Sequence, residues 1–304
     1  MQNKNQTLPD TNYIIDNTVY PIGKDSDGVM NTTKELHEVI LSIVLEFDRV
    51  CRKNNIPYAL GFGSALGIHN YQGFIPWDDD ADIVFMYEDI ERLVAALKRD
   101  LDPRFAFDAY ETDPRYNVLI PTMKITRVDT YLKEKNWLTL PNKCRKHAGV
   151  FVDICAFIGV PENAKEHYKL IKKTKRVMPW YVFIDGILRL QPYRLKKKIK
   201  RFEEQVAKQY QSSSSVSQTI IIPWQDWSRD VDRLAFPRKV ILPFREYTFE
   251  GHRVYSFNNI EEFVRLRYGE KALRKIEDGK WYDPYPLERR KAGHIAAYNL
   301  KRAK

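Results

Sequence analysis

The sequence has few cysteines, no long apolar run and no internal repeat. Its three cysteines, Cys51, Cys144 and Cys155, are odd in number and lack metal-ligand spacing, so we predict reduced thiols instead of a disulfide framework. No run approaches the ~18–20 apolar residues that a membrane-spanning helix requires. The first thirty residues lack the apolar segment of a signal peptide. These absences predict a cytoplasmic protein, either soluble or peripheral on the inner face of the cell membrane.

Positive charge exceeds negative charge in this chain. Fifty Lys and Arg residues against 40 Asp and Glu give a formal net charge of +10, which predicts an acidic partner. The excess is concentrated between Lys165 and Arg201, where apolar and aromatic residues such as Trp180 interleave with the lysines. Three interpretations stay open for this segment: a helical cap with its lysines in water, a contact with an anionic membrane or lipid-linked acceptor, or a contact with nucleic acid. We favour nucleic acid least.

Acidic residues are grouped in the run Trp77–Phe85. Asp80 and Asp82 lead directly into a β-branched and aromatic stretch, as carboxylates entering a buried strand do. Side chains two apart on a strand share a face, so Asp78, Asp80 and Asp82 are expected to lie together. Like charges so close resist being ionised together, and a hard divalent cation such as Mg2+ removes that penalty. The alternative is a solvated acidic turn.

Two further segments could complete such a site. Gly63 and Ser64 follow a short apolar segment and precede a short predicted helix; glycine permits close approach of a phosphate, and helix N-termini favour anions. Asp153 interrupts the apolar run 148–158, where an unpaired charge would be costly. The alternatives are an ordinary turn at Gly63 and an ion pair between Asp153 and a nearby Lys or Arg.

The remaining pattern predicts an α+β fold. Thr32 and Glu35 form a capping box for a helix that ends at Asn54–Asn55, and a second helix is expected at about residues 89–99. A hairpin is predicted to turn at Glu250–Gly251, followed by a helix that Asn258–Asn259 cap and that stops at Gly269. Strands are expected near residues 58–61, 82–87, 105–110, 117–126 and 149–158.

These elements suggest four parts of the chain. We expect a disordered leader over 1–30, a catalytic core over 31–160 and a helical basic subdomain over 161–218 that ends in the Ser-rich linker or loop Ser212–Ser215. The C-terminal part, 219–304, is expected to pack on the core.

Together the motifs resemble the nucleotidyltransferase superfamily, in which a Gly-Ser turn, an Asp-x-Asp pair and a third carboxylate meet. The stretch from Gly61 to Phe85 is similar to the signature of the LicD family, and Met123–Thr126, Val152–Ile154 and the block from Leu242 to Gly269 agree with it. One departure is Ala65–Ile68, where relatives more often read leucine-leucine-glycine-alanine. The resemblance implies a nucleotidyltransferase-like mixed sheet flanked by helices. It also implies transfer of phosphocholine from CDP-choline to a surface glycan, with fukutin-type ribitol-phosphate transferases as relatives.

We assign roles to the matching residues on this basis. Asp80 and Asp82 would hold the Mg2+ or Mn2+ that grips the donor pyrophosphate, and Asp153 would complete a second metal site or deprotonate the acceptor hydroxyl. Gly63 and Ser64 would contact the donor phosphate. Lys124 would neutralise that phosphate, or be a surface lysine. Trp77 would stack on a base or a quaternary ammonium group, or belong to the core.

Three functions follow. The first is transfer of phosphocholine or a similar phospho-alcohol from a CDP-linked donor to a sugar hydroxyl of a cell-surface glycan (lipopolysaccharide, teichoic acid or capsule) or its lipid-linked precursor. The second is nucleotidyl transfer from an NTP to a small molecule or RNA end, which uses the same carboxylates. The third is a non-catalytic basic binding protein on a transferase fold.

Overall fold

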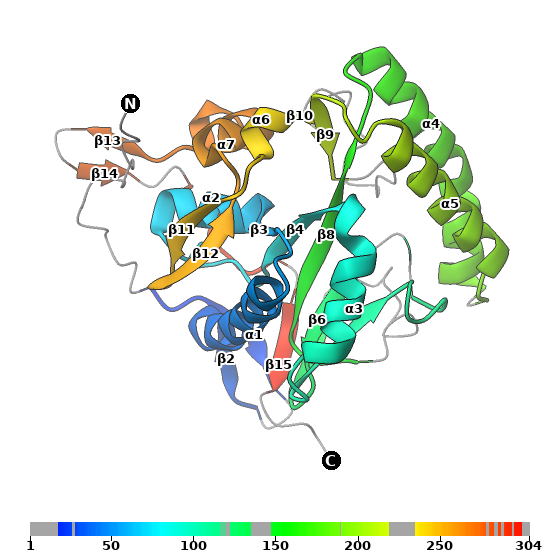
Figure 1. The fold of residues 1–304 in the computed structure, drawn as a ribbon. Coiled ribbons are helices and arrows are strands. Elements are labelled where there is room, and N and C mark those ends of the chain that lie inside the picture. The colour runs from blue at the N-terminus through cyan, green and yellow to red at the C-terminus, as the bar shows by residue number, and fades with distance from the viewer. Residues whose placement is uncertain are drawn as a thin grey trace.

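The computed structural model (Figure 1) describes residues 18–25, 28–116, 118, 122–134, 147–188, 190–218, 235–277, 280–282, 285–286, 289–293 and 295–299. Its helices are α1 Thr33–Lys53, α2 Phe62–Tyr71, η1 Tyr87–Asp89, α3 Ile90–Asp100, α4 Ala164–Tyr181, η2 Val182–Ile187, α5 Tyr193–Gln209, α6 Arg238–Ile241, α7 Ile260–Tyr268 and η5 Glu270–Ala272. Its strands are β1 Pro21–Lys24, β2 Met30–Thr32, β3 Ala59–Leu60, β4 Asp82–Met86, β5 Phe105–Ala109, β6 Met123–Arg127, β7 Tyr131–Glu134, β8 Phe151–Gly159, β9 Ser215–Ser217, β10 Ala235–Pro237, β11 Arg245–Phe249, β12 His252–Ser256, β13 Lys275–Glu277, β14 Lys280–Tyr282 and β15 Ile295–Asn299. The predicted α+β class is confirmed.

One mixed sheet of nine strands, counted over the described residues, carries the core. Its main order is β10-β9-β8-β4-β3-β12-β11, with β6 also pairing with β8 and β5 pairing with β6. Strand β8 runs parallel to β4 and antiparallel to β6. Because β8 lies between these two strands, a side chain near its start can meet side chains from both.

Helix α1 forms as its capping box predicts. The Thr32 side chain accepts from the Glu35 N–H, and the Glu35 side chain accepts from the Thr32 N–H, which satisfies two backbone donors at once. Asn54 is the C-cap. The buried side of α1 packs on β6 and β8, and α1 and α3 lie in front of the central strands in Figure 1. Its fully buried side chains include Leu36, Ile40, Ile43, Val44, Phe47 and Val50.

Helices α4, η2 and α5 form a structure that we call the helical arm (residues 164–209). The helices run side by side at one edge of the molecule in Figure 1, and they lie within residues 161–218, where helices were predicted. A separate apolar cluster joins the arm to the end of β8, with Ile199 and Val206 of α5 packed near Ile158 and Val160. The arm is therefore anchored at its base by a core of its own.

The C-terminal part of the chain returns to the sheet. The predicted hairpin is confirmed, since β11 and β12 pair around a turn at Glu250–Gly251. Glu250 fixes this turn to the loop after α2: its N–H donates to Gln72 O at 2.9 Å, and its Oε1 accepts from Phe74 N at 2.8 Å. Asn259 caps α7 through the Glu262 N–H, also as predicted. Strand β15 pairs with β7.

Two predicted segments are more ordered than expected. Within the expected leader, Tyr20 is buried and residues 21–24 form β1, because Tyr20 packs edge-on against the Trp77 ring. For Ser212–Ser215 the loop alternative holds, since Ser213 Oγ donates to Val160 O at 2.6 Å and Ser215 begins β9. Residues 1–17, Cys144 and part of the expected strand 117–126 lie outside the described residues; that strand begins at Met123. The division into core, subdomain and C-terminal part remains a prediction.

Candidate active site

Asp82 and Asp153 lie side by side in the sheet. Asp82 begins β4, Asp153 is the third residue of β8, and the two are register partners in the parallel pairing. The Asp153 N–H donates to Ala81 O at 3.1 Å. Neighbouring strands lie about 4.8 Å apart, and partners in register face the same side of the sheet. Two carboxylates predicted from distant motifs are therefore brought together.

The acidic loop before β4 alternates in burial. Asp79 and Ala81 are fully buried, whereas Asp78, Asp80 and Asp82 are partly exposed. This is the alternation that the sequence predicts, although only Asp82 belongs to the strand. Asp79 Oδ2 accepts from the Ile295 N–H at 2.7 Å. The buried aspartate thus ties the loop to β15, while Asp78, Asp80 and Asp82 remain partly accessible to solvent.

The Gly-Ser segment lies within the first turn of α2, not before it. Gly61 is the N-cap, and Phe62 has a positive φ of 43°, a strained conformation for a bulky residue. Ser64 Oγ accepts from the Asp82 N–H at 3.0 Å, and the Gly61 N–H donates to Asp82 O at 3.0 Å. A Cβ added at Gly63 would lie 3.2 Å from Asp78 Oδ2. The helix start and the acidic strand therefore form one unit.

Lys124 reaches Asp153 from the other neighbouring strand. The two residues are register partners across β6 and β8, and Lys124 Nζ lies 2.5 Å from Asp153 Oδ1. The ammonium also lies 3.3 Å from the centre of the Phe151 ring, and Lys124 is only 5% exposed. The contact is ionic, because Asp153 Oδ1 has no well-directed hydrogen bond among the described residues. Lys124 is thus a buried partner of the third carboxylate and not a surface lysine.

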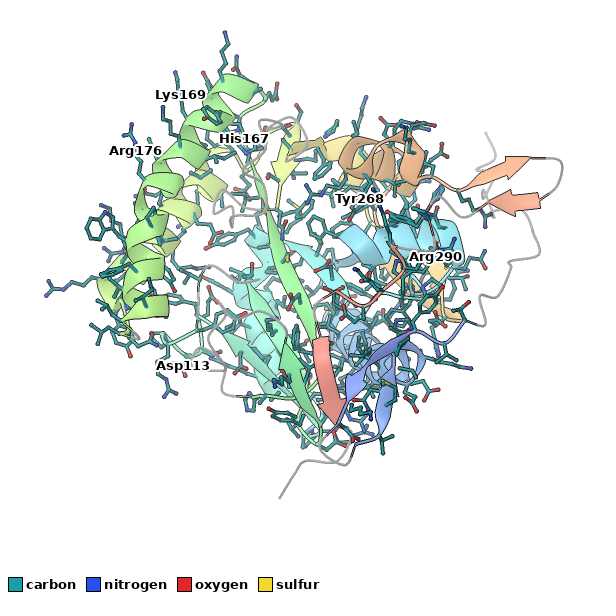
Figure 2. All side chains as sticks on the ribbon, turned by 180° about the vertical axis from the view of Figure 1, so that it is seen from behind. Asp113, His167, Lys169, Arg176, Tyr268 and Arg290 are labelled. Atoms are coloured by element: carbon teal, nitrogen blue, oxygen red, sulfur yellow. The ribbon has the colours of Figure 1, made fainter. Side chains whose placement is uncertain are left out.

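Trp77 is a core residue in this structure. It is 7% exposed and packs edge-on against Tyr20, Tyr71 and Tyr285 at centroid distances of 5.7–5.9 Å. The guanidinium of Arg290 lies 5.0 Å from the Trp77 ring centre. A cation of the protein therefore already occupies one cation–π position of this ring. Figure 2 shows Arg290 in the same region of the molecule as Tyr268.

Tyr268 and Cys155 lie near the carboxylates, although the sequence did not predict either of them as a site residue. Tyr268 ends α7, and burial raises the pKa of its phenol, with the negative charges of Asp82 and Asp78 acting in the same direction. Burial likewise raises the pKa of the Cys155 thiol, reinforced by Asp82 and Asp153. Tyr268 belongs to the distal block that carried the family resemblance, which was the available signal for it. No sequence motif indicated that Arg290 would lie near the site.

The acidic residues suit a hard divalent cation. Among the described residues, ligand oxygens of Asp78, Asp79 and Asp80 lie within 4.8 Å of one another. The predicted ligand set, Asp80, Asp82 and Asp153, shares only Asp80 with this group; Asp82 and Asp153 are register partners on β4 and β8 and do not belong to it. Carboxylate oxygens are the ligands that Mg2+ selects, and the ionic contact at Asp153 Oδ1 leaves a buried acceptor without a directed donor. The residues present therefore fit such an ion.

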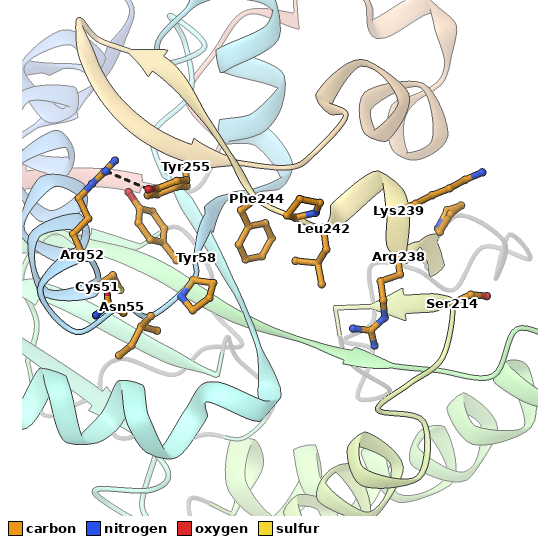
Figure 3. A pocket seen from close by; sticks show the side chains of 14 residues that line it. Cys51, Arg52, Asn55, Tyr58, Ser214, Arg238, Lys239, Leu242, Phe244 and Tyr255 are labelled. Atoms are coloured by element: carbon orange, nitrogen blue, oxygen red, sulfur yellow. Dashed lines mark hydrogen bonds between the residues drawn. The ribbon is translucent and has the colours of Figure 1, made fainter. Parts of the chain in front are cut away.

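A cavity of about 1250 Å³ lies elsewhere (Figure 3). It is lined by Tyr58, Arg238 and Tyr255 among others, and none of the predicted site residues lines it. Tyr58 precedes β3, which runs antiparallel to β4, so the cavity lies toward the end of β4 that is far from Asp82. Both of its arginines are engaged: Arg52 pairs with Asp48 and Glu246, and Arg238 donates to carbonyl oxygens of residues 211 and 213. The cavity is therefore separate from the predicted active-site carboxylates.

Comparisons with known proteins agree with this site. Residues 55–180 match the family model described as LicD/FKTN/FKRP, nucleotidyltransferase domain. The chain is 29% identical over 146 residues to the lipopolysaccharide cholinephosphotransferase LicD of Haemophilus influenzae, covering 48% of this chain and 52% of that protein. It is 33% identical over 118 residues to an uncharacterized protein of Rickettsia prowazekii, covering 38% of this chain and 37% of that protein. The chain thus spans about half or less of the length of these curated relatives. The matched region contains Gly63, Ser64, the acidic loop, Lys124 and Asp153.

Proposed function

We propose that this chain, whose residues 55–180 match the LicD family model, belongs to that family and transfers phosphocholine, or a similar phospho-alcohol, from a CDP-linked donor to a glycan hydroxyl. The observation that carries the proposal is the adjacency of Asp82 and Asp153 beside the start of α2. The acceptor is a sugar of a cell-surface glycan or of its lipid-linked precursor. The transferred group and the acceptor come from the relative's name and from the family resemblance.

Asp80, Asp82 and Asp153 would hold Mg2+ or Mn2+. When bound, the ion would neutralise charge on the donor pyrophosphate, which is the main requirement of phosphoryl transfer. Asp78, packed against Gly63, would support this set from the loop. Asp79 is less suited to a ligand role, because its Oδ2 already accepts from the Ile295 N–H.

The chain's own groups bind and orient the donor. The Ser64 hydroxyl accepts from the Asp82 N–H and keeps its own proton, so it can donate that proton to a phosphate oxygen. Gly63 adds no side chain at the first turn of α2, where the helix N-terminus favours an anion. Lys124 balances the charge of Asp153 and holds that carboxylate in place.

The reaction is a displacement at phosphorus. The acceptor oxygen attacks the β-phosphorus of the donor, a new P–O bond forms, and the bond to the bridging oxygen breaks, so that CMP leaves with that oxygen. The proton of the acceptor hydroxyl passes to a nearby base; in the alternative role given to Asp153, this carboxylate accepts the proton instead of completing a second metal site.

Release of CMP tests the proposal. Purified protein with CDP-choline, a glycan acceptor and Mg2+ is expected to release CMP, and the double variant Asp80→Asn, Asp82→Asn is expected to release none. Omitting Mg2+ or adding EDTA should have the same effect as the double variant. Wild-type activity in the double variant would refute the assignment of the carboxylates.

A second function is favoured by the description of the matching domain as a nucleotidyltransferase domain. In that reaction the acceptor attacks the α-phosphorus of an NTP, and pyrophosphate leaves in place of CMP. An assay with the four NTPs that measures pyrophosphate separates the two reactions. A non-catalytic binding protein would release neither product, and its ligand binding would be insensitive to the aspartate changes.

A further inference from the structure

The far end of the helical arm exposes large apolar side chains. Eleven large apolar residues are exposed among the described residues, and six of them lie within residues 180–193. Trp180 and Ile187 are each 66% exposed and Leu190 is 58% exposed. The six residues, which we call the apolar tip, are Trp180, Phe183, Ile187, Leu188, Leu190 and Tyr193. Such a concentration of exposed apolar residues in one short segment is typical of an interaction site.

The exposure does not result from loose packing of the arm. Tyr181, next to Trp180, is 1% exposed and belongs to the cluster that joins the arm to β8. Lys196 is fully buried, and its Nζ donates to Arg115 O at 2.9 Å and to Gln191 Oε1 at 2.8 Å. The chain turns through η2, a π-helix that follows Pro179 inside α4. The tip is thus held outward by a fixed base.

Basic residues flank the apolar tip in the sequence. Residues 165–201 contain thirteen Lys or Arg and two Asp or Glu, so their formal charge of +11 accounts for the whole net charge of +10. Lys173 and Arg176 on α4, and Lys197 and Lys198 on α5, are exposed. Figure 2 shows Lys169 and Arg176 pointing outward from α4. The arm therefore combines an exposed apolar segment with exposed basic residues before and after it in the chain, which we call the basic border.

We propose that the apolar tip docks on the surface of an anionic phospholipid bilayer. Tryptophan and tyrosine prefer the boundary between headgroups and acyl chains, and Ile187, Leu188 and Leu190 would enter the acyl region. The basic border would attract anionic headgroups. Within the part of the chain that the structure describes, no helix is long and apolar enough to cross a membrane, so the tip lies on the bilayer and does not span it.

Other occupants fit less well. Nucleic acid would use the lysines but gains little from the aliphatic side chains of the apolar tip. A second copy of the chain would bring two borders of the same sign together, which opposes association. An anionic bilayer satisfies both the apolar tip and the basic border. This proposal concerns the arm and does not depend on the reaction at the carboxylates.

Vesicle co-sedimentation of the full chain tests the proposal. We expect binding to vesicles of phosphatidylcholine mixed with phosphatidylglycerol, weaker binding to phosphatidylcholine alone, and a loss of binding as salt rises. Each basic residue near the surface contributes about fivefold in partitioning, so Lys197→Glu with Lys198→Glu should reduce binding by about 25-fold or more. Trp180→Glu with Ile187→Glu should reduce binding to both vesicle types.

Matched control variants exist on other surfaces. Val29→Glu replaces a 60% exposed apolar residue near β2, and Lys98→Glu reverses an exposed lysine on α3; both should bind as the wild type does. Unchanged thermal melting of all variants checks their folding. The proposal is overturned if the wild type stays in the supernatant with anionic vesicles, or if the tip variants bind as well as the controls. It is also overturned if those variants lose only RNA binding, or only self-association in sedimentation velocity, with vesicle binding intact.

Discussion

Asp82 and Asp153, seventy-one residues apart in the chain, are neighbours in register on the parallel strands β4 and β8. The pairing fixes their separation by backbone hydrogen bonds, including the one from Asp153 N–H to Ala81 O. Their distance therefore does not depend on a flexible loop. A metal or catalytic site needs its carboxylates in a constant arrangement, and the pairing of β4 with β8 provides it.

The first prediction concerns these two carboxylates. Asp82→Asn and Asp153→Asn keep the shape of each side chain and remove its charge, so each should lower the rate of CMP release by about 10²-fold or more, a typical cost of losing one charge-stabilising group. Initial rates under saturating donor measure the effect. Asp113→Asn is the control, because Asp113 lies in a surface turn and pairs with Arg115 at 2.6 Å. Equal activity of all three variants would contradict the prediction.

The second prediction concerns the buried ion pair. Lys124→Met removes the ammonium and leaves the Asp153 carboxylate without its partner, which costs about 3–5 kcal/mol for a fully buried pair. Because the Asp153 side chain is 19% exposed, we expect a smaller loss, about 2–3 kcal/mol, in the free energy of unfolding. Urea unfolding measures it. Adding Asp153→Asn to Lys124→Met should recover part of the loss, and no recovery would mean that Lys124 stabilises through other contacts.

The third prediction concerns Trp77. Its ring is buried among three tyrosines, so Trp77→Ala should lower the free energy of unfolding by about 3–5 kcal/mol. Trp77→Phe should cost less. Because the buried ring has no contact with the donor in this assignment, the KM for the donor should change by less than about threefold, or about 0.65 kcal/mol of binding. A large rise in KM with unchanged melting would instead support the predicted stacking of Trp77 on the substrate.

The fourth prediction is a dependence of stability on pH. Burial lowers the pKa of His167, on α4, from 6.5 to about 4. Between these values the unfolded chain binds a proton that the folded chain does not, so the free energy of unfolding falls as the pH drops from about 6.5 to about 4 and levels off below. At 1.36 kcal/mol per pKa unit the loss is at most about 3 kcal/mol, and partial solvation reduces it to about 2 kcal/mol.

Urea unfolding at pH 7 and at pH 4.5 measures the effect of His167. In His167→Leu the difference between the two pH values should shrink by that amount, because the ring no longer takes up a proton. His252→Leu, at an exposed position on β12, should change it little. An equal shrinkage in both variants would place the effect elsewhere.

Short sequence patterns predicted most of the helices and strands that carry the site. The capping box at Thr32 and Glu35, the alternation through Asp78–Asp82 and the apolar run around Asp153 each depend on neighbours within a few residues. Such patterns predict α1, β4 and β8, and the family resemblance supplied the expectation that β4 and β8 meet.

Contacts between distant segments were not predictable in the same way. The pairing of Lys124 with Asp153 depends on the register of β6 against β8. A shift of one residue in this register would turn the Lys124 side chain to the other face of the sheet. Arg290, which lies over Trp77, comes from a part of the chain without a pattern of its own. Tyr268 lies in a predicted helix, but its position beside the carboxylates depends on how that helix packs. The first turn of α2 was misplaced by one or two residues, because Gly61 caps the helix without a side chain.

The hydrogen bond from Ile295 N–H to Asp79 has a consequence for synthesis of the protein. During translation the acidic loop leaves the ribosome long before residue 295 is synthesised. Asp79 therefore cannot accept this hydrogen bond until nearly the whole polypeptide has been made. A product that terminates early, before Ile295, would carry every motif by which the family is recognised and still lack the anchor of its acidic loop.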